Sequence, residues 1–138
     1  MNNDLPYILL ADDDPDDREA LIQPFVQQNP NVRVIVMGDG QELLNFLGSC
    51  PGDALPVLIL MDYKMPILTA AEILEKLAGD NRYTEIPKLV WSTSDRAEYV
   101  DRCLQHGALA YFAKPSSLAE LAKIVERMTL TFRGAITT

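Results

Sequence analysis

Short apolar runs alternate along this chain with longer segments in which apolar residues recur at helical spacing. The short runs are rich in Val, Ile, Leu and aromatic residues and lack polar alternation, which is typical of strands buried on both faces of a parallel sheet. They cover residues 8–11, 32–36, 57–61, 89–91 and 109–113. The pattern therefore predicts five strands, each followed by an amphipathic helix.

Each predicted helix has a recognisable start. The signals are Asp14-Pro15, Asp39 with Glu42, Thr69 with Glu72, Ser94-Asp95 with Glu98, and Ser117 with Glu120. An Asp, Ser or Thr cap followed three residues later by Glu is typical of a capping box, and Pro suits the first helical position. Gly48 and Gly107 are expected to end the second and fourth helices.

Five strand–helix units in succession predict the α/β class, a doubly wound five-stranded parallel sheet with five helices. Right-handed crossovers would place helices on both of its faces. We expect a single domain over residues 1–138, with its core at about 7–131 and a short tail at 132–138, and no output domain in the same chain.

Composition and charge exclude several classes of function. The chain has 138 residues, with 20 acidic and 12 basic ones, and a net charge of −8. Without a basic run it is a poor candidate for direct binding to nucleic acid. The longest apolar stretch, at residues 55–61, is far too short to span a bilayer. The first residues carry no basic segment of the kind that opens a secretory signal. Cys50 and Cys103 lack metal-ligand spacing, so we expect reduced thiols in a cytoplasmic protein.

The charge is concentrated in one place. Residues 1–19 hold seven acids and one base, and so carry −6 of the net charge. Asp14 is interpreted as a helix cap. Asp16, Asp17 and Glu19 are interpreted as first-turn acids that suit the helix dipole and do nothing else.

Polar residues follow the predicted strands where a doubly wound sheet binds its ligands, at the carboxyl ends. Asp12 and Asp13 follow the first strand, Asp62 the third, Ser92 the fourth and Lys114 the fifth. Clustered carboxylates need a cation, and oxygen ligands with vacant positions suit Mg²⁺. Lys and Ser can bind phosphoryl oxygens. This combination indicates phosphoryl transfer, with a carboxylate as the nucleophile.

The segments ILLADDDPDDRE, LILMDYKMP, WSTS and GALAYFAKP occur in this order, each at a strand end. From about Tyr7 to Met128 the chain thus resembles a response-regulator receiver domain of the CheY-like, two-component type. The resemblance implies a flavodoxin-like fold with strand order 2-1-3-4-5, an order for which this family is a standard example.

The resemblance also implies a role for each matching residue. Asp62 matches the phosphoacceptor. Asp12 and Asp13 match the acids that hold Mg²⁺, Asp13 directly and Asp12 through water. The backbone carbonyl of Lys64 matches a further metal ligand.

The remaining matches surround that centre. Ser92 matches the hydroxyl that swings toward the phosphoryl group, and Lys114 the lysine that pairs with it. Tyr111 matches an aromatic switch, and Pro115 a proline after a cis peptide bond that helps to aim the lysine.

Three positions depart from the family pattern. Thr69-Ala70 replaces the usual Asp-Gly, and Thr93 is bulkier than the usual small residue after the hydroxyl. Thr93 and the long cationic Lys64 are expected to shield an acyl phosphate from water, so that it is lost slowly.

The resemblance implies a phosphorylation-switched signalling module rather than an enzyme. It would accept phosphate from the phosphohistidine of a sensor histidine kinase or a phosphotransfer protein. It would bind a downstream protein through its fourth helix, fifth strand and fifth helix, roughly residues 94–128, without contacting nucleic acid or membrane.

Two alternatives stay open at this point. Asp12-x-Asp14 resembles the motif of Mg²⁺-dependent haloacid-dehalogenase phosphohydrolases, in which the first Asp is the nucleophile. Pro15 and the lack of a later Asp pair count against this. The other alternative is a degenerate receiver that never takes phosphate, and the complete set of residues counts against it.

Overall fold

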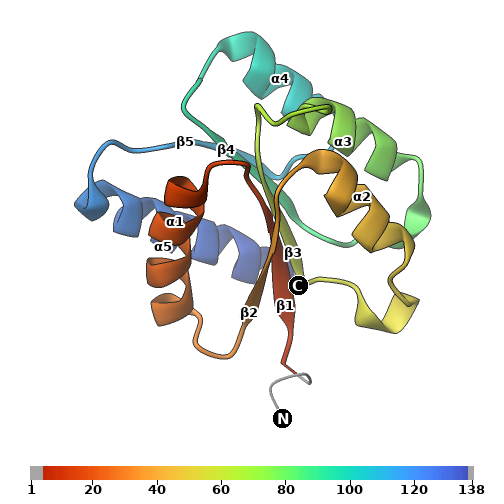
Figure 1. Cartoon of the computed structure of the whole chain (residues 1–138), viewed down its shortest axis with the longest axis horizontal. Helices are drawn as coiled ribbons and strands as arrows, with labels where there is room; N and C mark the ends of the chain where they lie inside the picture. The colour runs from red at the N-terminus through yellow and green to blue at the C-terminus, as the bar shows by residue number, and fades with distance from the viewer. Residues whose placement is uncertain (1–4, 137–138) are drawn as a thin grey trace.

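The computed structural model describes residues 5–136, which form one parallel sheet with helices on both faces (Figure 1). The strands are β1 (Tyr7–Ala11), β2 (Arg33–Met37), β3 (Leu58–Asp62), β4 (Lys88–Ser92) and β5 (Ala110–Ala113). They pair in the order β2-β1-β3-β4-β5. Both the strand positions and the strand order predicted from the sequence are confirmed.

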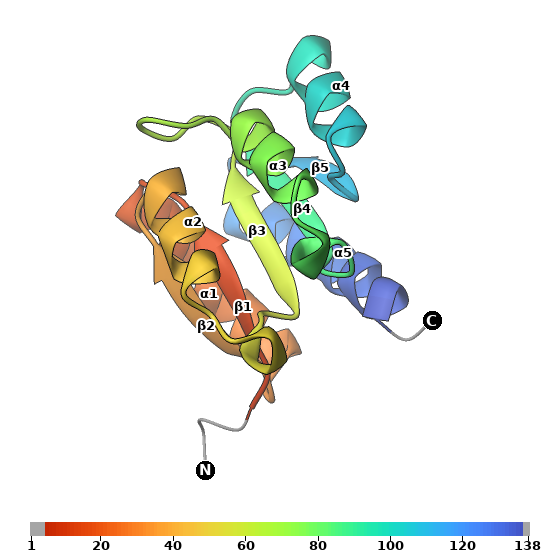
Figure 2. The same ribbon diagram turned by 90° about the vertical axis from the view of Figure 1, so that its right-hand side faces the viewer.

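In the described residues, four α-helices and two short 3-10 turns lie between the strands, and a fifth α-helix follows the last strand. The helices are α1 (Pro15–Gln28), α2 (Gly40–Gly48), α3 (Ala70–Ala78), α4 (Ala97–Gln105) and α5 (Leu118–Ile136), and the turns are η2 (Gly52–Ala54) and η3 (Asn81–Tyr83). Figure 2 shows α2 and α3 in front of the sheet, with α1 and α5 behind it. None of the helices in residues 5–136 has the length and hydrophobicity that crossing a bilayer requires.

Two hydrophobic layers hold the helices on the sheet. On one face Leu21 and Phe25 of α1 and Val125 of α5 pack against Ile8 and Leu10. On the other face, residues of α2, α3 and α4 pack against alternate positions of the same strands, such as Leu9 and Ile59. Side chains alternate between the two faces along a strand, so a strand covered on both sides must be apolar throughout. This explains the uninterrupted apolar runs of β1 and β3. The edge strands β2 and β5 are less buried.

The helix caps largely follow the predicted chemistry. Asp14 accepts hydrogen bonds from the backbone N–H groups of Asp16 and Asp17, and Thr69 forms a reciprocal capping box with Glu72. Ser117 accepts one from Glu120. The box predicted for α2 is shifted. Asp39 accepts from the N–H of Glu42, as predicted, but the Glu42 carboxylate accepts instead from Gly38.

Two helix boundaries differ from the sequence prediction. The fourth helix starts at Ala97 instead of Ser94-Asp95, and Arg96 at its N-cap makes no side-chain capping bond. The Ser94 backbone is used elsewhere, because its N–H donates to Ser92 Oγ and its carbonyl accepts from the Tyr111 hydroxyl. The fifth helix runs on to Ile136, past the expected boundary at 131, because Phe132 is buried against the core.

We expect Gly40→Ala to destabilise the protein. A Cβ at Gly40 would lie 2.6 Å from Ile73 Cδ1 and 3.2 Å from Leu68 Cβ. Because Ile73 is fully buried, the surroundings have little room to move, and overpacking of this kind costs about 1–3 kcal/mol. Urea denaturation followed by circular dichroism measures the change. Gly48→Ala, at the other end of α2, is the control, since a Cβ there meets nothing within 4 Å. Equal losses for the two variants would contradict this account.

Candidate functional site

Three carboxylates meet at the carboxyl ends of β1 and β3. Oxygens of Asp12, Asp13 and Asp62 all lie within 4.8 Å of one another. Asp12 is fully buried and Asp62 is 7% exposed, whereas Asp13 is open to solvent. The donors are all oxygens and one side of the cluster is open, which suits a hard divalent cation that keeps some of its water.

The backbone around Asp12 fixes this geometry. Its N–H donates to the Met37 carbonyl at 3.2 Å, continuing the pairing of β1 with β2. Its Oδ1 accepts from the N–H of Asp14 at 2.9 Å, and its carbonyl accepts from Arg18 Nη1 at 2.8 Å. Asp62 is the last residue of β3 and is in register with Trp91 of β4. The two central carboxylates are therefore held by the sheet itself.

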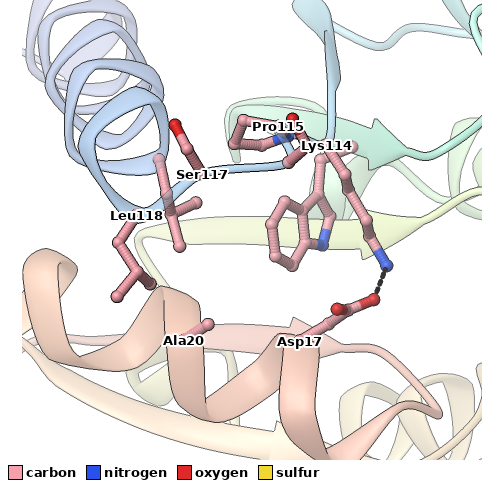
Figure 3. A pocket seen from close by; sticks show the side chains of 9 residues that line it. Asp17, Ala20, Lys114, Pro115, Ser117 and Leu118 are labelled. Atoms are coloured by element: carbon pink, nitrogen blue, oxygen red, sulfur yellow. Dashed lines mark hydrogen bonds and ion pairs between the residues drawn. The ribbon is translucent and has the colours of Figure 1, made fainter.

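Lys114 brings one ammonium group into this cluster. Its Nζ lies 2.8 Å from Asp17 Oδ2, 2.9 Å from Asp12 Oδ2 and 3.4 Å from Asp62 Oδ2. Figure 3 shows Asp17 of α1 and Lys114, which follows β5, pointing toward one another at the edge of a small pocket. The Lys114 backbone N–H donates to the Ser92 carbonyl at 2.7 Å, which extends the pairing of β4 with β5. Trp91 is buried, and its ring centroid lies 4.6 Å from Lys114 Nζ.

The site has an excess of negative charge. Burial raises the pKa of Asp62 to about 6, Lys114 opposes this shift, and the neighbouring Asp12 and Asp13 add to it. The pKa of Asp12 is also raised by burial, against the hydrogen bonds from Lys114 and Asp14. Burial lowers the pKa of Lys114, but its bonds to Asp17 and Asp12 outweigh this and the pKa rises. One lysine does not neutralise the cluster, so a bound cation would stabilise it.

Ser92 and Thr93 lie at the end of β4. Ser92 is 1% exposed, and its Oγ accepts a hydrogen bond from the Ser94 N–H at 3.1 Å. Thr93 is exposed, as is Lys64. Lys64 Nζ is directed toward α4, 5.7 Å from the centroid of the Tyr99 ring. Both of these long or bulky side chains thus stand at the solvent boundary of the site.

Three tyrosines connect Asp62 to α4 and β5. Tyr63 follows Asp62 and stacks on Tyr99 of α4, with ring centroids 4.3 Å apart and an interplanar angle of 16°. Its centroid lies 6.4 Å from that of Tyr111 on β5, whose hydroxyl donates to the Ser94 carbonyl. Only Tyr111 was singled out from the sequence. Tyr63 directly follows the candidate nucleophile, and this position is the sequence feature that could have identified it.

Two predictions about this site were wrong. The described residues contain no cis peptide bond, so Pro115 follows a trans bond. The trans form is favoured by about 0.5–1 kcal/mol for an X–Pro bond, and Lys114 reaches its carboxylates without the cis form. Asp17 does more than suit the helix dipole, contrary to the sequence prediction, because its carboxylate accepts a hydrogen bond from Lys114. Asp17 lies in the first turn of α1, which begins just after Asp12 and Asp13, and this nearness in sequence could have placed it at the site.

Comparison with known proteins identifies the family. The response regulator receiver domain matches residues 8–126. The chain belongs to this family. The rice (Oryza sativa subsp. japonica) two-component response regulator ORR5 is 31% identical over 123 residues, covering 89% of this chain and 88% of its own. The Arabidopsis thaliana regulator ARR3 is 29% identical, covering 94% of this chain and 58% of its own.

Solved receiver structures share the fold. The phosphorylated cyanobacterial phytochrome response regulator RcpA superposes with a TM-score of 0.81 at 24% identity, covering 90% of this chain and 91% of its own. The Mn²⁺-bound response regulator Rcp1 gives 0.79 at 24% identity, covering 89% and 91%. The receiver domain of two-component response regulators is therefore the correct assignment, and nothing in these comparisons supports the haloacid-dehalogenase alternative.

The raised pKa of Asp62 has a consequence for stability. Its native pKa of about 6 exceeds the value of about 3.9 in an unfolded chain, so the native protein loses stability as the pH rises through this window. In the absence of divalent ions, we therefore expect Asp62→Asn to stabilise the receiver by about 1–3 kcal/mol near pH 7. The gain should be smaller near pH 4.5.

Urea denaturation in the presence of a chelator at the two pH values measures this difference. Asp53→Asn, at an exposed acid in η2, is the matched control and should leave stability unchanged. If the gain in stability for Asp62→Asn were equal at the two pH values, or larger at the lower one, the raised pKa of Asp62 would not be the cause of the lost stability.

Proposed function

We propose that this receiver accepts a phosphoryl group on Asp62 in a Mg²⁺-dependent reaction and thereby switches a partner-binding surface. Receiver domains of its family interact with histidine kinases or phosphotransfer proteins, and we propose a phosphohistidine of such a protein as the donor. One observation carries the proposal. The Asp62 carboxylate lies within one cluster with Asp12 and Asp13, and 3.4 Å from the Lys114 ammonium.

In the proposed reaction an oxygen of Asp62 attacks the phosphorus atom. The phosphorus–nitrogen bond to the donor imidazole breaks, its electron pair stays on nitrogen, and an acyl phosphate forms on Asp62. The nucleophile must be ionised, and a pKa of about 6 leaves it mostly so near neutral pH even without a cation. Because the attack occurs at the end of β3, the sheet holds the nucleophile in place.

The acidic cluster would hold the metal ion. We propose Asp13, Asp62 and the backbone carbonyl of Lys64 as direct ligands of Mg²⁺, with Asp12 acting through water. The excess negative charge and the exposure of Asp13 support this set of residues. When bound, Mg²⁺ would neutralise charge on the transferring phosphoryl oxygens.

Lys114 and Ser92 complete the proposed site. Lys114 would pair with a phosphoryl oxygen as a compact positive charge, and its three N–H donors allow this while other bonds remain. The Ser92 hydroxyl would donate to the phosphoryl group. The Tyr111 hydroxyl bonds the Ser94 carbonyl, two residues after Ser92, and burial raises its pKa. We propose that a movement of Ser92 changes the position of Tyr111.

The switched surface would comprise α4, β5 and α5. Large apolar side chains are exposed there, with Leu104 at 45%, Leu109 at 48% and Leu118 at 78%. Exposed apolar side chains such as these are suited to contact with a protein partner. We propose that the receiver acts as a signalling phosphoacceptor, with only the loss of its own phosphoryl group as turnover.

Phosphorylation of Asp62 can be tested directly. The protein is incubated with Mg²⁺ and either beryllofluoride or a small acyl-phosphate donor. We expect a mass shift on Asp62 and a change in the fluorescence of Trp91, the single tryptophan, and we expect neither in a chelator. Asp62→Asn should abolish both signals, and Asp53→Asn should keep both. An unmodified wild type, or label on Asp12, would overturn the proposal. Label on Asp12 would revive the phosphohydrolase.

The lifetime of the acyl phosphate is a second test. Thr93 follows Ser92, Lys64 lies two residues after Asp62, and both are exposed; we propose that they hinder the approach of water to the phosphorus atom. We therefore expect the double variant Thr93→Ala, Lys64→Asn to lose its phosphoryl group several-fold faster than the wild type. Decay of radiolabelled protein after removal of the donor measures this. Faster decay in the wild type than in the double variant would be the contrary result.

A further inference from the structure

We propose that Asp17 is a positioning residue that holds the Lys114 ammonium back from Asp62 and so favours binding of the divalent cation. This inference rests on the proposed function, because it concerns the same carboxylates and the same lysine. Asp17 belongs to α1 and is not itself part of the cluster formed by Asp12, Asp13 and Asp62.

The geometry around the Lys114 ammonium supports a restraint. Nζ makes hydrogen bonds at 2.8 Å to Asp17 and 2.9 Å to Asp12, whereas Asp62 lies at 3.4 Å, outside the usual hydrogen-bond range. The centroid of the Trp91 ring lies 4.6 Å from Nζ. Two of the three ammonium protons are directed to Asp12 and Asp17, which leaves at most one for Asp62, at the longest of the three distances.

The charges around Lys114 also support this role of Asp17. Lys114 and Mg²⁺ compete for the same carboxylates, since each lowers the repulsion between Asp12 and Asp62. Without the Asp17 carboxylate, Lys114 would move toward Asp62 and neutralise charge that the cation needs. Removing Asp17 would also remove one negative charge close to the site. Both effects weaken Mg²⁺ binding, so the sign of the expected change is the same for each.

The neighbouring acid Asp16 provides a matched control. It lies on the same turn of α1 and is exposed, and in the described part of the chain its carboxylate makes no ion pair. Asp16→Asn and Asp17→Asn therefore remove the same charge from adjacent positions, but only the second removes a contact with Lys114. The Asp17 side chain is 37% exposed, so its replacement should leave the fold intact.

The experiment measures Mg²⁺ affinity by titration calorimetry and by Trp91 fluorescence in the wild type, Asp16→Asn, Asp17→Asn and Asp17→Glu. We expect the dissociation constant of Mg²⁺ to rise roughly two- to fivefold in Asp17→Asn, the range expected for a partly exposed ion pair. Asp16→Asn should stay close to the wild type, and Asp17→Glu should recover most of the affinity. At saturating Mg²⁺, the maximal beryllofluoride adduct on Asp62 should equal that of the wild type in all variants.

The outcomes separate this inference from the proposed function. If Asp17→Asn binds Mg²⁺ as Asp16→Asn does, or more tightly than the wild type, the role of Asp17 is refuted while Asp62 remains the phosphoacceptor. A lower maximal adduct without a change in Mg²⁺ affinity would also refute it. If the wild type forms no adduct on Asp62, the proposed function itself fails, whatever the affinities are.

Discussion

Repulsion among the carboxylates at one end of the sheet is the constraint on which the rest of this structure depends. Asp12 and Asp62 lie buried near each other because the neighbouring parallel strands β1 and β3 end at the same edge, and Asp13 adds a third negative charge. A single lysine offsets part of this charge. Burial, with a smaller contribution from the remaining charge, raises the pKa of Asp62, and the remaining charge makes the site suited to a cation. Stability is thus reduced at the place where the chemistry is expected to occur.

The sheet makes this arrangement tolerable. β1, β3 and β4 are buried on both faces, and the layer of α1 and α5 and the layer of α2, α3 and α4 fix their positions. Hydrogen bonds between strands continue into the site itself, since Asp12 bonds Met37 and Lys114 bonds Ser92 through the backbone. The backbone at Asp12 and Lys114 therefore cannot shift far without breaking strand pairing.

The elements of the fold and the composition of the site could be predicted because they depend on local patterns. Apolar runs give the strands, capping residues give most helix starts, and parallel strands bring Asp12, Asp62 and Lys114 to one edge. The start of α4 could not be predicted, since the Ser94 backbone is bound by Tyr111 from a distant strand. The same holds for the contact of Asp17 with Lys114, which depends on how α1 sits beside the segment after β5. Contacts between elements are set by packing, which the local pattern does not record.

The stacked rings of Tyr63 and Tyr99 link α4 to the residue directly after Asp62, the proposed phosphoacceptor. Tyr63 is the next residue after Asp62. A change at the Asp62 carboxylate that moves the backbone there would therefore also move the Tyr63 ring against Tyr99. Coupling free energies are reciprocal. A protein that binds α4 and displaces Tyr99 would therefore change the affinity of the acidic cluster for its cation. The cation would change the affinity of that protein for α4 by the same factor. The α4 surface proposed to bind the partner would then also be a place from which cation binding at the site is regulated.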